Sequence, residues 1–278
     1  MELVVRFVAA ITIALSVCLA GCKTGESIDD AITPSNDRDW AEDQAVLPYA
    51  KIKRDKVTVY NVRNCSYISA DEYIVDHHDK TYDLSKLTSV DYVVVPFKST
   101  PALAHTMLSF GFEDNDYLAV SVEVRKEQGE TYSAMKGLAR QYELMYVVGE
   151  ERDLVRLRTS FRGDDVYVYR VRATPEQVRA LFLDVMRRAN DLKRHPEFYD
   201  TFANNCTTNL ADHVNRLNPG KVPMDYRVLL PGFSDQMAYE LGLLATDTSF
   251  EETKRRANVT AKARQHADSP LFSQLIRQ

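Results

Sequence analysis

One cysteine and one histidine carry the clearest chemical potential in this sequence. Cys206 stands within Thr-Phe-Ala-Asn-Asn-Cys-Thr-Thr-Asn-Leu, directly ahead of an apolar periodic run that predicts a helix. Amides and hydroxyls typical of helix caps surround it. It would therefore lie at the positive end of the helix dipole, where a thiolate is stabilised and the pKa of a thiol falls. His105 stands about a hundred residues upstream. Brought together by the fold, the two would form a nucleophile and its base.

Two predicted strands, residues 103–110 and 117–125, would place polar partners beside His105. Alternation along the first strand puts His105 on its more polar face, and alternation along the second does the same for Ser121 and Glu123. The short acidic link between the strands predicts an antiparallel hairpin in which these two faces coincide. We therefore expect His105 to lie near Ser121 or Glu123.

The acidic partner of His105 has a chemical and a structural interpretation. Glu123, or failing it Ser121, would orient the imidazole, and a carboxylate stabilises an imidazolium better than a hydroxyl does. Alternatively, Glu123 forms a buried ion pair with Arg125 or Arg140. A lone histidine such as His105 is also commonly a partly buried residue whose ring is satisfied by a backbone carbonyl.

The composition indicates a globular protein but does not indicate a substrate. The chain has 278 residues, 45% of them hydrophobic, and a formal charge of −5. These values describe one large globular domain or two small ones. Nothing is basic enough to indicate nucleic acid as a partner, and so small a charge says little about any other partner.

The first 22 residues predict export and lipidation. Arg6 precedes an apolar core that ends in Leu-Ala-Gly-Cys at Cys22, a pattern typical of a secretory signal and too short for a stable membrane span. Leu-Ala-Gly-Cys resembles the bacterial lipobox, in which Cys22 would be lipidated and become the new N-terminus. An ordinary signal peptide is the alternative. Because Lys23 rather than aspartate follows the cysteine, we expect an anchor facing the periplasm, with the outer membrane favoured.

Two further sets of residues have alternatives to a catalytic role. Cys65 and Cys206 would be the only cysteines left in the folded part of the mature chain, and in an oxidising envelope they could form a disulfide. His77-His78-Asp79 is expected in a polar turn where adjacent side chains diverge, with no third ligand at metal-site spacing. We therefore predict no metal site, and no motif indicates a cofactor.

The chain divides into four predicted parts. Residues 1–22 are the signal segment, and residues 23–50 are polar enough to predict a flexible tether. Residues 51–232 form the folded domain, and residues 233–278 form a C-terminal helical extension. Further strands are predicted at 57–62, 73–75, 91–97, 142–148 and 166–171, helices at 133–141, 175–195 and 235–243, and a helix or irregular turn at 151–161. Residues 251–266 form a polar helix that we expect to be peripheral or frayed.

Four ordered motifs resemble the Lnb N-terminal periplasmic domain family. They are Ala-His-Thr with Ser-Phe at 104–110, Ser-Val-Glu-Val-Arg-Lys-Glu at 121–127, Arg-Gln-Tyr-Glu-Leu at 140–144, and Phe-Tyr with Asn-Cys-Thr-Thr at 198–208. The resemblance covers about residues 57–222. It implies an α+β, permuted papain-like fold with an antiparallel sheet and packed helices, similar to NlpC-type peptidases and lecithin retinol acyltransferase.

The same resemblance implies lipoprotein N-acylation, in which an acyl chain passes from a phospholipid to the amino group of a lipoprotein. His105 would take the proton of Cys206, and the thiolate would attack an acyl ester to form a thioester. The backbone N–H of Cys206 and a neighbouring donor such as Asn205 would bind the oxyanion. Two alternatives stay open. One is a thiol amidase or peptidase acting on cell-wall peptide, and the other is a non-catalytic envelope lipoprotein with a Cys65–Cys206 disulfide.

Overall fold

The computed structural model describes residues 33–278, so the predicted signal segment and Cys22 lie outside the described residues. The chain divides into two units, residues 1–35 and 36–278. The second unit contains all of the strands and helices given below. It combines one large sheet with several helices, which confirms the predicted α+β class.

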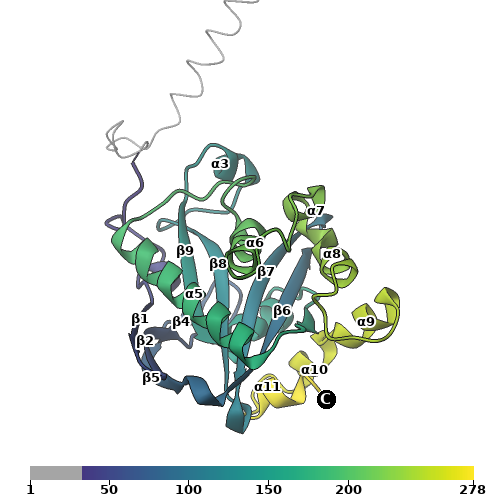
Figure 1. Ribbon diagram of the computed structural model, residues 1–278. Coiled ribbons are helices and arrows are strands. Elements are labelled where there is room, and N and C mark those ends of the chain that lie inside the picture. The colour runs from purple at the N-terminus through teal and green to yellow at the C-terminus, as the bar shows by residue number, and fades with distance from the viewer. Residues whose placement is uncertain (1–32) are drawn as a thin grey trace, which may run out of the picture. The chain divides into compact units, whose positions relative to one another are not determined.

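A mixed eight-stranded sheet forms the centre of this unit (Figure 1). Its strand order is β1-β2-β9-β8-β7-β6-β10, with β5 also paired to β2. All pairings are antiparallel except that of β2 with β9, which are parallel through Arg63 and Gly149. The strands are β1 (Tyr49–Lys53), β2 (Lys56–Arg63), β5 (His77–Asp83), β6 (Leu87–Phe97), β7 (Thr100–Phe112), β8 (Tyr117–Arg125), β9 (Glu143–Glu150) and β10 (Tyr167–Arg170). A separate hairpin joins β3 (Ser66–Tyr67) to β4 (Tyr73–Ile74).

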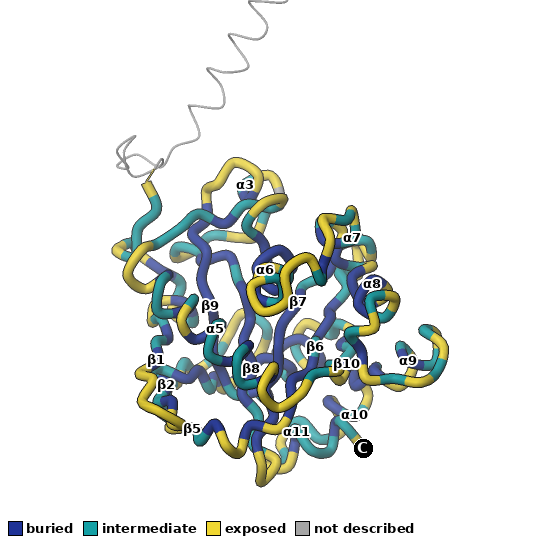
Figure 2. The backbone as a smooth tube through the Cα atoms, in the orientation of Figure 1, coloured by how far each residue is buried: buried dark blue, intermediate teal, exposed yellow. Residues whose placement is uncertain are grey.

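Helices cover both faces of the sheet and make three layers. On one face lie α5 (Pro175–Arg194) and α6 (Cys206–Leu217), which share a core with Val120 and Val122 of β8. On the other face α4 (Glu151–Arg156), α10 (Thr260–Gln265) and α11 (Phe272–Leu275) share a second core with Met107 and Ala119. Because both faces are covered, the central strands are buried along most of their length (Figure 2).

Local sequence explains the longest helix. The Thr174 hydroxyl accepts a hydrogen bond from the backbone N–H of Gln177, whose side chain bonds back to the backbone of Thr174. Pro175 occupies the first helical position, where its missing N–H costs nothing. The apolar face of this helix is buried, through Val178, Leu181, Phe182, Val185 and Met186. The remaining helical segments are η1 (Glu42–Gln44), η2 (Leu84–Lys86), η3 (Glu113–Asn115), α3 (Ala134–Leu138), η4 (Leu157–Phe161), α7 (Tyr226–Leu229), η5 (Pro231–Phe233), α8 (Ser234–Glu240) and α9 (Phe250–Ala257).

The predicted tether, residues 23–50, is wrong from Asn36 onward, where the chain is part of the folded unit. Trp40 is buried, bridges to Glu127, and lies under the guanidinium of Arg125 at 4.1 Å from the ring centroid. Gln44 is also buried and donates to the carbonyl oxygen of Val124. Contacts with residues some 80 positions away stabilise this segment, and its own polar composition could not reveal them.

The prediction of a peripheral or frayed helix at 251–266 is also wrong. The segment breaks into α9 and α10 at Asn258, and Val259 and Ala263 enter the second core together with Phe272 and Ile276. The apolar residues are few and small, so they do not form the periodic stripe that marks a packed helix in a sequence.

Candidate active site

The start of α6 is built by a side-chain cap. The side-chain oxygen of Asn205 accepts hydrogen bonds from the N–H groups of Thr207, at 2.8 Å, and Thr208, at 2.9 Å. The Thr208 hydroxyl in turn accepts from the backbone N–H of Asn205. This capping box makes Cys206 the first residue of the helix, as predicted. Its backbone N–H has no acceptor among residues 33–278, as is usual for the first N–H groups of a helix.

Asn205 is therefore a helix cap, and one N–H of its side-chain amide is already engaged. Its side-chain nitrogen donates to the backbone oxygen of Thr201 at 2.7 Å, while its oxygen is held by the helix. Binding of the oxyanion by the second N–H of this amide stays a prediction. Because an asparagine one residue before a nucleophile suits both roles, the sequence could not separate them.

The strands β7 and β8 separate at the site. Their pairing ends at Met107 and Ser121, whereas β6 continues to pair with β7 past Ala104 to Thr100. Beyond Met107 a gap therefore opens between β7 and β8, at the level of His105 and Glu123. The pairing itself confirms the predicted antiparallel hairpin.

His105 belongs to a chain of four polar side chains. Its Nε2 lies 2.6 Å from the Ser121 hydroxyl and 3.3 Å from the Glu123 carboxylate. Ser121 donates to Glu123 at 2.6 Å, and Arg158 donates to the same carboxylate oxygen at 2.7 Å. Because Nε2 is engaged by Ser121 and Glu123, Nδ1 is the ring nitrogen left to face Cys206. His105 thus has a side-chain network, not the backbone carbonyl of a core histidine.

The predicted ion pair of Glu123 with Arg125 or Arg140 is wrong, because both arginines have other partners. Arg125 donates to the backbone oxygens of Gln44 and Ala45, and Arg140 pairs with Asp200 at the surface. The cation beside Glu123 is Arg158 of η4, which sequence reasoning missed. Its residue is 3% exposed, and a buried arginine needs a carboxylate partner. No local pattern in the sequence marks Arg158, because Arg156 and Arg162 stand close to it in the same segment.

Electrostatics at the site favour an ionised pair. Burial alone would raise the pKa of Glu123, but His105, Arg158 and Ser121 hold it well below its usual range. Burial lowers the pKa of His105, yet the carboxylate of Glu123 and the sulfur of Cys206 raise it overall. The site therefore holds an ionised carboxylate against an imidazole that binds its proton more tightly than usual.

The thiol of Cys206 is acidified by this arrangement. Burial raises its pKa, but the hydrogen bond and charge of His105, with the hydroxyl and backbone N–H of Thr106, lower it to about 7. A thiol with that pKa is about half thiolate at neutral pH. The structure thus brings Cys206, His105, Ser121 and Glu123 together as predicted.

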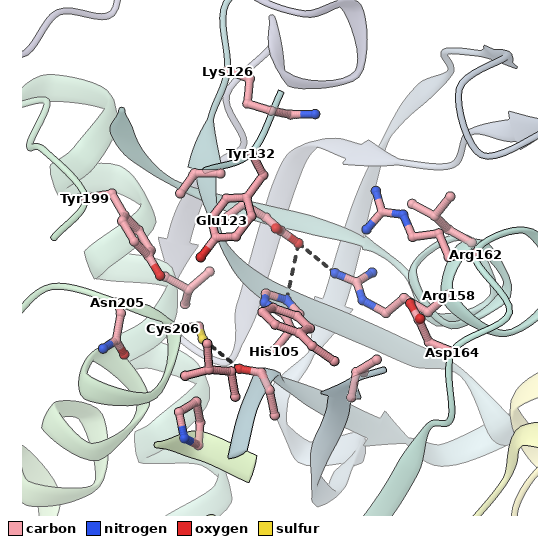
Figure 3. Close-up of a pocket in the computed structure, with 18 of the residues that line it drawn as sticks. His105, Glu123, Lys126, Tyr132, Arg158, Arg162, Asp164, Tyr199, Asn205 and Cys206 are labelled. Atoms are coloured by element: carbon pink, nitrogen blue, oxygen red, sulfur yellow. Dashed lines mark hydrogen bonds and ion pairs between the residues drawn. The ribbon is translucent and has the colours of Figure 1, made fainter. Parts of the chain in front are cut away.

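Three of these side chains, those of Cys206, His105 and Glu123, line a cavity of about 290 Å³. Figure 3 shows the hydroxyls of Tyr132 and Tyr199 directed from the opposite wall toward the sulfur of Cys206. Burial and the nearby charge of Cys206 raise the pKa of Tyr199 far above its usual value, so its hydroxyl stays protonated. Within the described part of the chain that hydroxyl has no hydrogen-bond partner. Sequence reasoning assigned Tyr199 only to a motif and missed this placement.

The second cysteine is not bonded to the first. Cys65 and Cys206 are both free and buried, which contradicts the disulfide that the sequence left open as an alternative. Cys65 packs against Tyr67 and Leu157. Burial and the carboxylate of Asp153 raise the pKa of Cys65 to about 11, so it is inert where Cys206 is reactive.

The histidine pair at 77–78 lies outside this site. The two residues begin β5 instead of forming a turn, and they pair with Arg63 and Val62 of β2. His78 contacts the Glu150 carboxylate at 3.1 Å. The strand forms because residues 80–83 continue its pairing with β2, a contact that local turn residues do not reveal.

Residues 74–232 match the family described as the Lnb N-terminal periplasmic domain. The chain belongs to this family. Every residue of the site described above lies within the matched segment, and the match confirms the family that the four motifs predicted. This Lnb N-terminal domain protein is therefore a periplasm-facing protein of the cell envelope. No curated protein and no solved structure matches the chain. Between residues 33 and 278, the Lnb N-terminal domain protein has no helix long and apolar enough to cross a bilayer.

Proposed function

We propose that this protein is a thiol acyltransferase that moves an acyl chain from a phospholipid, through a thioester on Cys206, to an amino group of a lipoprotein. The observation that carries the proposal is the thiol itself. Cys206 starts a helix, faces a cavity, and has a pKa lowered to about 7 by a histidine that a carboxylate supports. These are the features of an activated nucleophile.

In the first half-reaction His105 takes the proton of the Cys206 thiol, and the sulfur bonds to the carbonyl carbon of the phospholipid ester. The carbon–oxygen bond then breaks, and His105 returns the proton to the departing glycerol oxygen, which leaves a lysophospholipid. In the second half an amine attacks the thioester carbon, gives its proton to His105, and displaces the sulfur. Glu123 stabilises the imidazolium in both halves, and Ser121 and Arg158 hold that carboxylate in place.

The developing oxyanion would be bound by the backbone N–H of Cys206 and by the hydroxyl of Tyr199. Both donors lack a partner among the described residues, and both lie beside the sulfur. One such donor contributes about 3 kcal/mol to the transition state. Tyr199 thus takes the role that the sequence had suggested for Asn205.

The proposal also includes a fold and a lipid anchor for this domain. A histidine on a sheet strand and a cysteine at the start of a packed helix are what a permuted papain-like fold requires, and we propose that this domain is of that kind. Cys22 would carry the lipid anchor, with the outer membrane favoured. An anchored domain stays close to the bilayer that supplies its acyl donor.

Intact mass tests the proposal directly. A chain beginning at Lys23 is incubated with phospholipid vesicles, and its mass is measured before and after hydroxylamine. We expect an acyl mass that hydroxylamine removes, because a thioester is labile to that reagent. The Cys65→Ser variant should gain the same acyl mass as the wild type and is the matched control. The Cys206→Ser and His105→Ala variants should gain no acyl mass.

A wild-type chain that stays unmodified, although the Cys206 thiol is free and reactive, would exclude phospholipid as the donor. Release of peptide fragments from cell-wall material by the same chain would then assign the site to an amidase or peptidase. Those enzymes use the same nucleophile and base, so the donor and not the site distinguishes the two reactions.

A further inference from the structure

The cavity opens at one end of the sheet. At this end β6 finishes at Phe97, β7 begins at Thr100, β8 finishes at Arg125 and β9 begins at Glu143. Phe97, from the first of these strand ends, lines the cavity. Lys126, Tyr132, Leu229 and Pro231, from the connecting segments around it, line the cavity as well. We call this end of the domain the mouth end.

Large apolar side chains are exposed on two sides of the cavity. They are Tyr132, Met135 and Phe202 on one side, and Met224, Tyr226 and Phe233 on the other. Met224 is 87% exposed, the highest value among the large apolar residues of the described chain. Figure 2 shows exposed residues at α3, which contains Met135, and at α7, which contains Tyr226. We call these six residues the rim.

Close packing holds both sides of the rim in place. A Cβ on Gly232 would lie 1.9 Å from the carbonyl oxygen of Pro101, so the segment of Phe233 is pressed against the start of β7. A Cβ on Gly137 would lie 2.6 Å from the hydroxyl of Thr201, so α3 lies directly against the segment that carries Phe202. The rim is therefore a defined surface, and an exposed apolar surface of this kind marks an interaction site.

The folded unit also begins at the mouth end. Its first residue, Asn36, accepts a hydrogen bond from Arg125, the last residue of β8, at 2.9 Å. Asn36 follows Cys22 by 14 positions, and a fully extended chain of that length spans at most about 50 Å. A lipid on Cys22 would therefore be joined to the folded unit at its mouth end.

Two cations at the cavity fit the headgroup region of a bilayer. Lys126 and Arg162 line it, and neither forms a salt bridge with a carboxylate of residues 33–278. Apolar side chains around a site, with cations beside them, are the pattern of a surface that inserts among acyl chains and attracts lipid phosphates.

We propose that the rim docks the domain on a phospholipid bilayer, so that the mouth of the Cys206 cavity faces the lipid surface. The inference rests on the proposed function, because the bilayer is the source of the acyl donor. It adds how the ester reaches the thiol: the rim residues enter the interface, and a phospholipid moves from there into the cavity without crossing water.

Vesicle sedimentation tests the docking without the chemistry. The chain beginning at Lys23 retains the whole folded unit, and Cys206→Ser removes acyl transfer. With vesicles of phosphatidylethanolamine and phosphatidylglycerol, the double variant Phe202→Ser/Met224→Ser should bind at least about tenfold more weakly than its parent, because two exposed apolar side chains no longer enter the interface.

Leu271 provides a matched control. It is 54% exposed, against 56% for Phe202. It directly precedes α11, whose neighbour Arg277 lies over the ring of Tyr117 at the start of β8, the end of the sheet opposite the mouth (Figure 1). Leu271→Ser should change vesicle binding by less than about twofold.

Three results would overturn the docking proposal. They are no vesicle binding by the parent, equal loss in the Leu271→Ser control, and a dimer of the parent that the Phe202→Ser/Met224→Ser variant loses, which would assign the rim to a second copy. The outcomes also separate the two proposals. Rim-dependent binding without a thioester on the wild-type chain keeps the docking and rejects phospholipid acyl transfer. A thioester formed equally well by the rim variant rejects only the docking.

Discussion

Removing the imidazole beside Cys206 should raise the pKa of its thiol by two units or more. His105 is the main group that lowers this pKa to about 7 from its ordinary value of 9.0, and burial acts in the opposite direction. In His105→Ala only burial and the groups of Thr106 remain. A shift of two units corresponds to about 3 kcal/mol of lost stabilisation of the thiolate.

The effect on reaction rate is smaller than the effect on ionisation. At pH 7 the thiolate fraction should fall from about one half to about 1%, roughly fiftyfold. However, each thiolate becomes more nucleophilic as its pKa rises, by about six- to tenfold over two units. The rate at pH 7 should therefore fall only about five- to eightfold, and above pH 9 the variant should react faster than the wild type. The two rate profiles should cross.

Dithiodipyridine, a small neutral disulfide, measures these rates between pH 5 and pH 10. The chain begins at Lys23 and carries Cys65→Ser, which leaves Cys206 as its only cysteine. We expect an apparent pKa near 7 with His105 present and at 9 or above without it. Equal apparent pKa values in the two proteins, or profiles that differ by a constant factor at every pH, would refute the assignment of His105 as the group that acidifies Cys206.

Two further variants test the groups around this pair. Glu123→Gln leaves the guanidinium of Arg158 buried without its carboxylate, so the free energy of unfolding in denaturant should fall by about 3–5 kcal/mol. The double variant Glu123→Gln/Arg158→Met should recover part of the lost free energy of unfolding, and no recovery would contradict the ion-pair explanation. Asn205→Ala should lower the free energy of unfolding by about 1 kcal/mol, and Asn205→Gly by only a few tenths, because glycine is tolerated at an N-cap. Equal losses in these last two variants would contradict the capping role.

The parts of the site that follow from short-range pattern were predictable. Asn-Cys-Thr-Thr before a periodic run predicts a capped helix, and alternation along two strands with a short link places His105 near Ser121 and Glu123. The hydrogen bonds from His105 to Ser121 and from Ser121 to Glu123 confirm that register.

The parts that depend on distant packing were not predictable. Arg158 reaches Glu123 from a helix on the far face of the sheet, and its sequence neighbours give no sign of that direction. Trp40 is buried because Arg125 lies over its ring, a contact between two segments that composition assigns to different parts of the chain. In each case the partner lies far along the sequence, so no local rule selects it.

The C-terminal arginine of the second core has a consequence for how the protein is made. The Arg277 guanidinium bonds to the buried carboxylates of Asp91 and Glu151, which precede it by 186 and 126 residues. Until that cation has been synthesised, the Glu151 carboxylate lacks its counter-ion, Asp91 of β6 has only Arg170, and the second core lacks Phe272 and Ile276. A nascent chain therefore cannot complete this sheet early. The second core is therefore completed only once residues 272–277 are available to pack against the sheet.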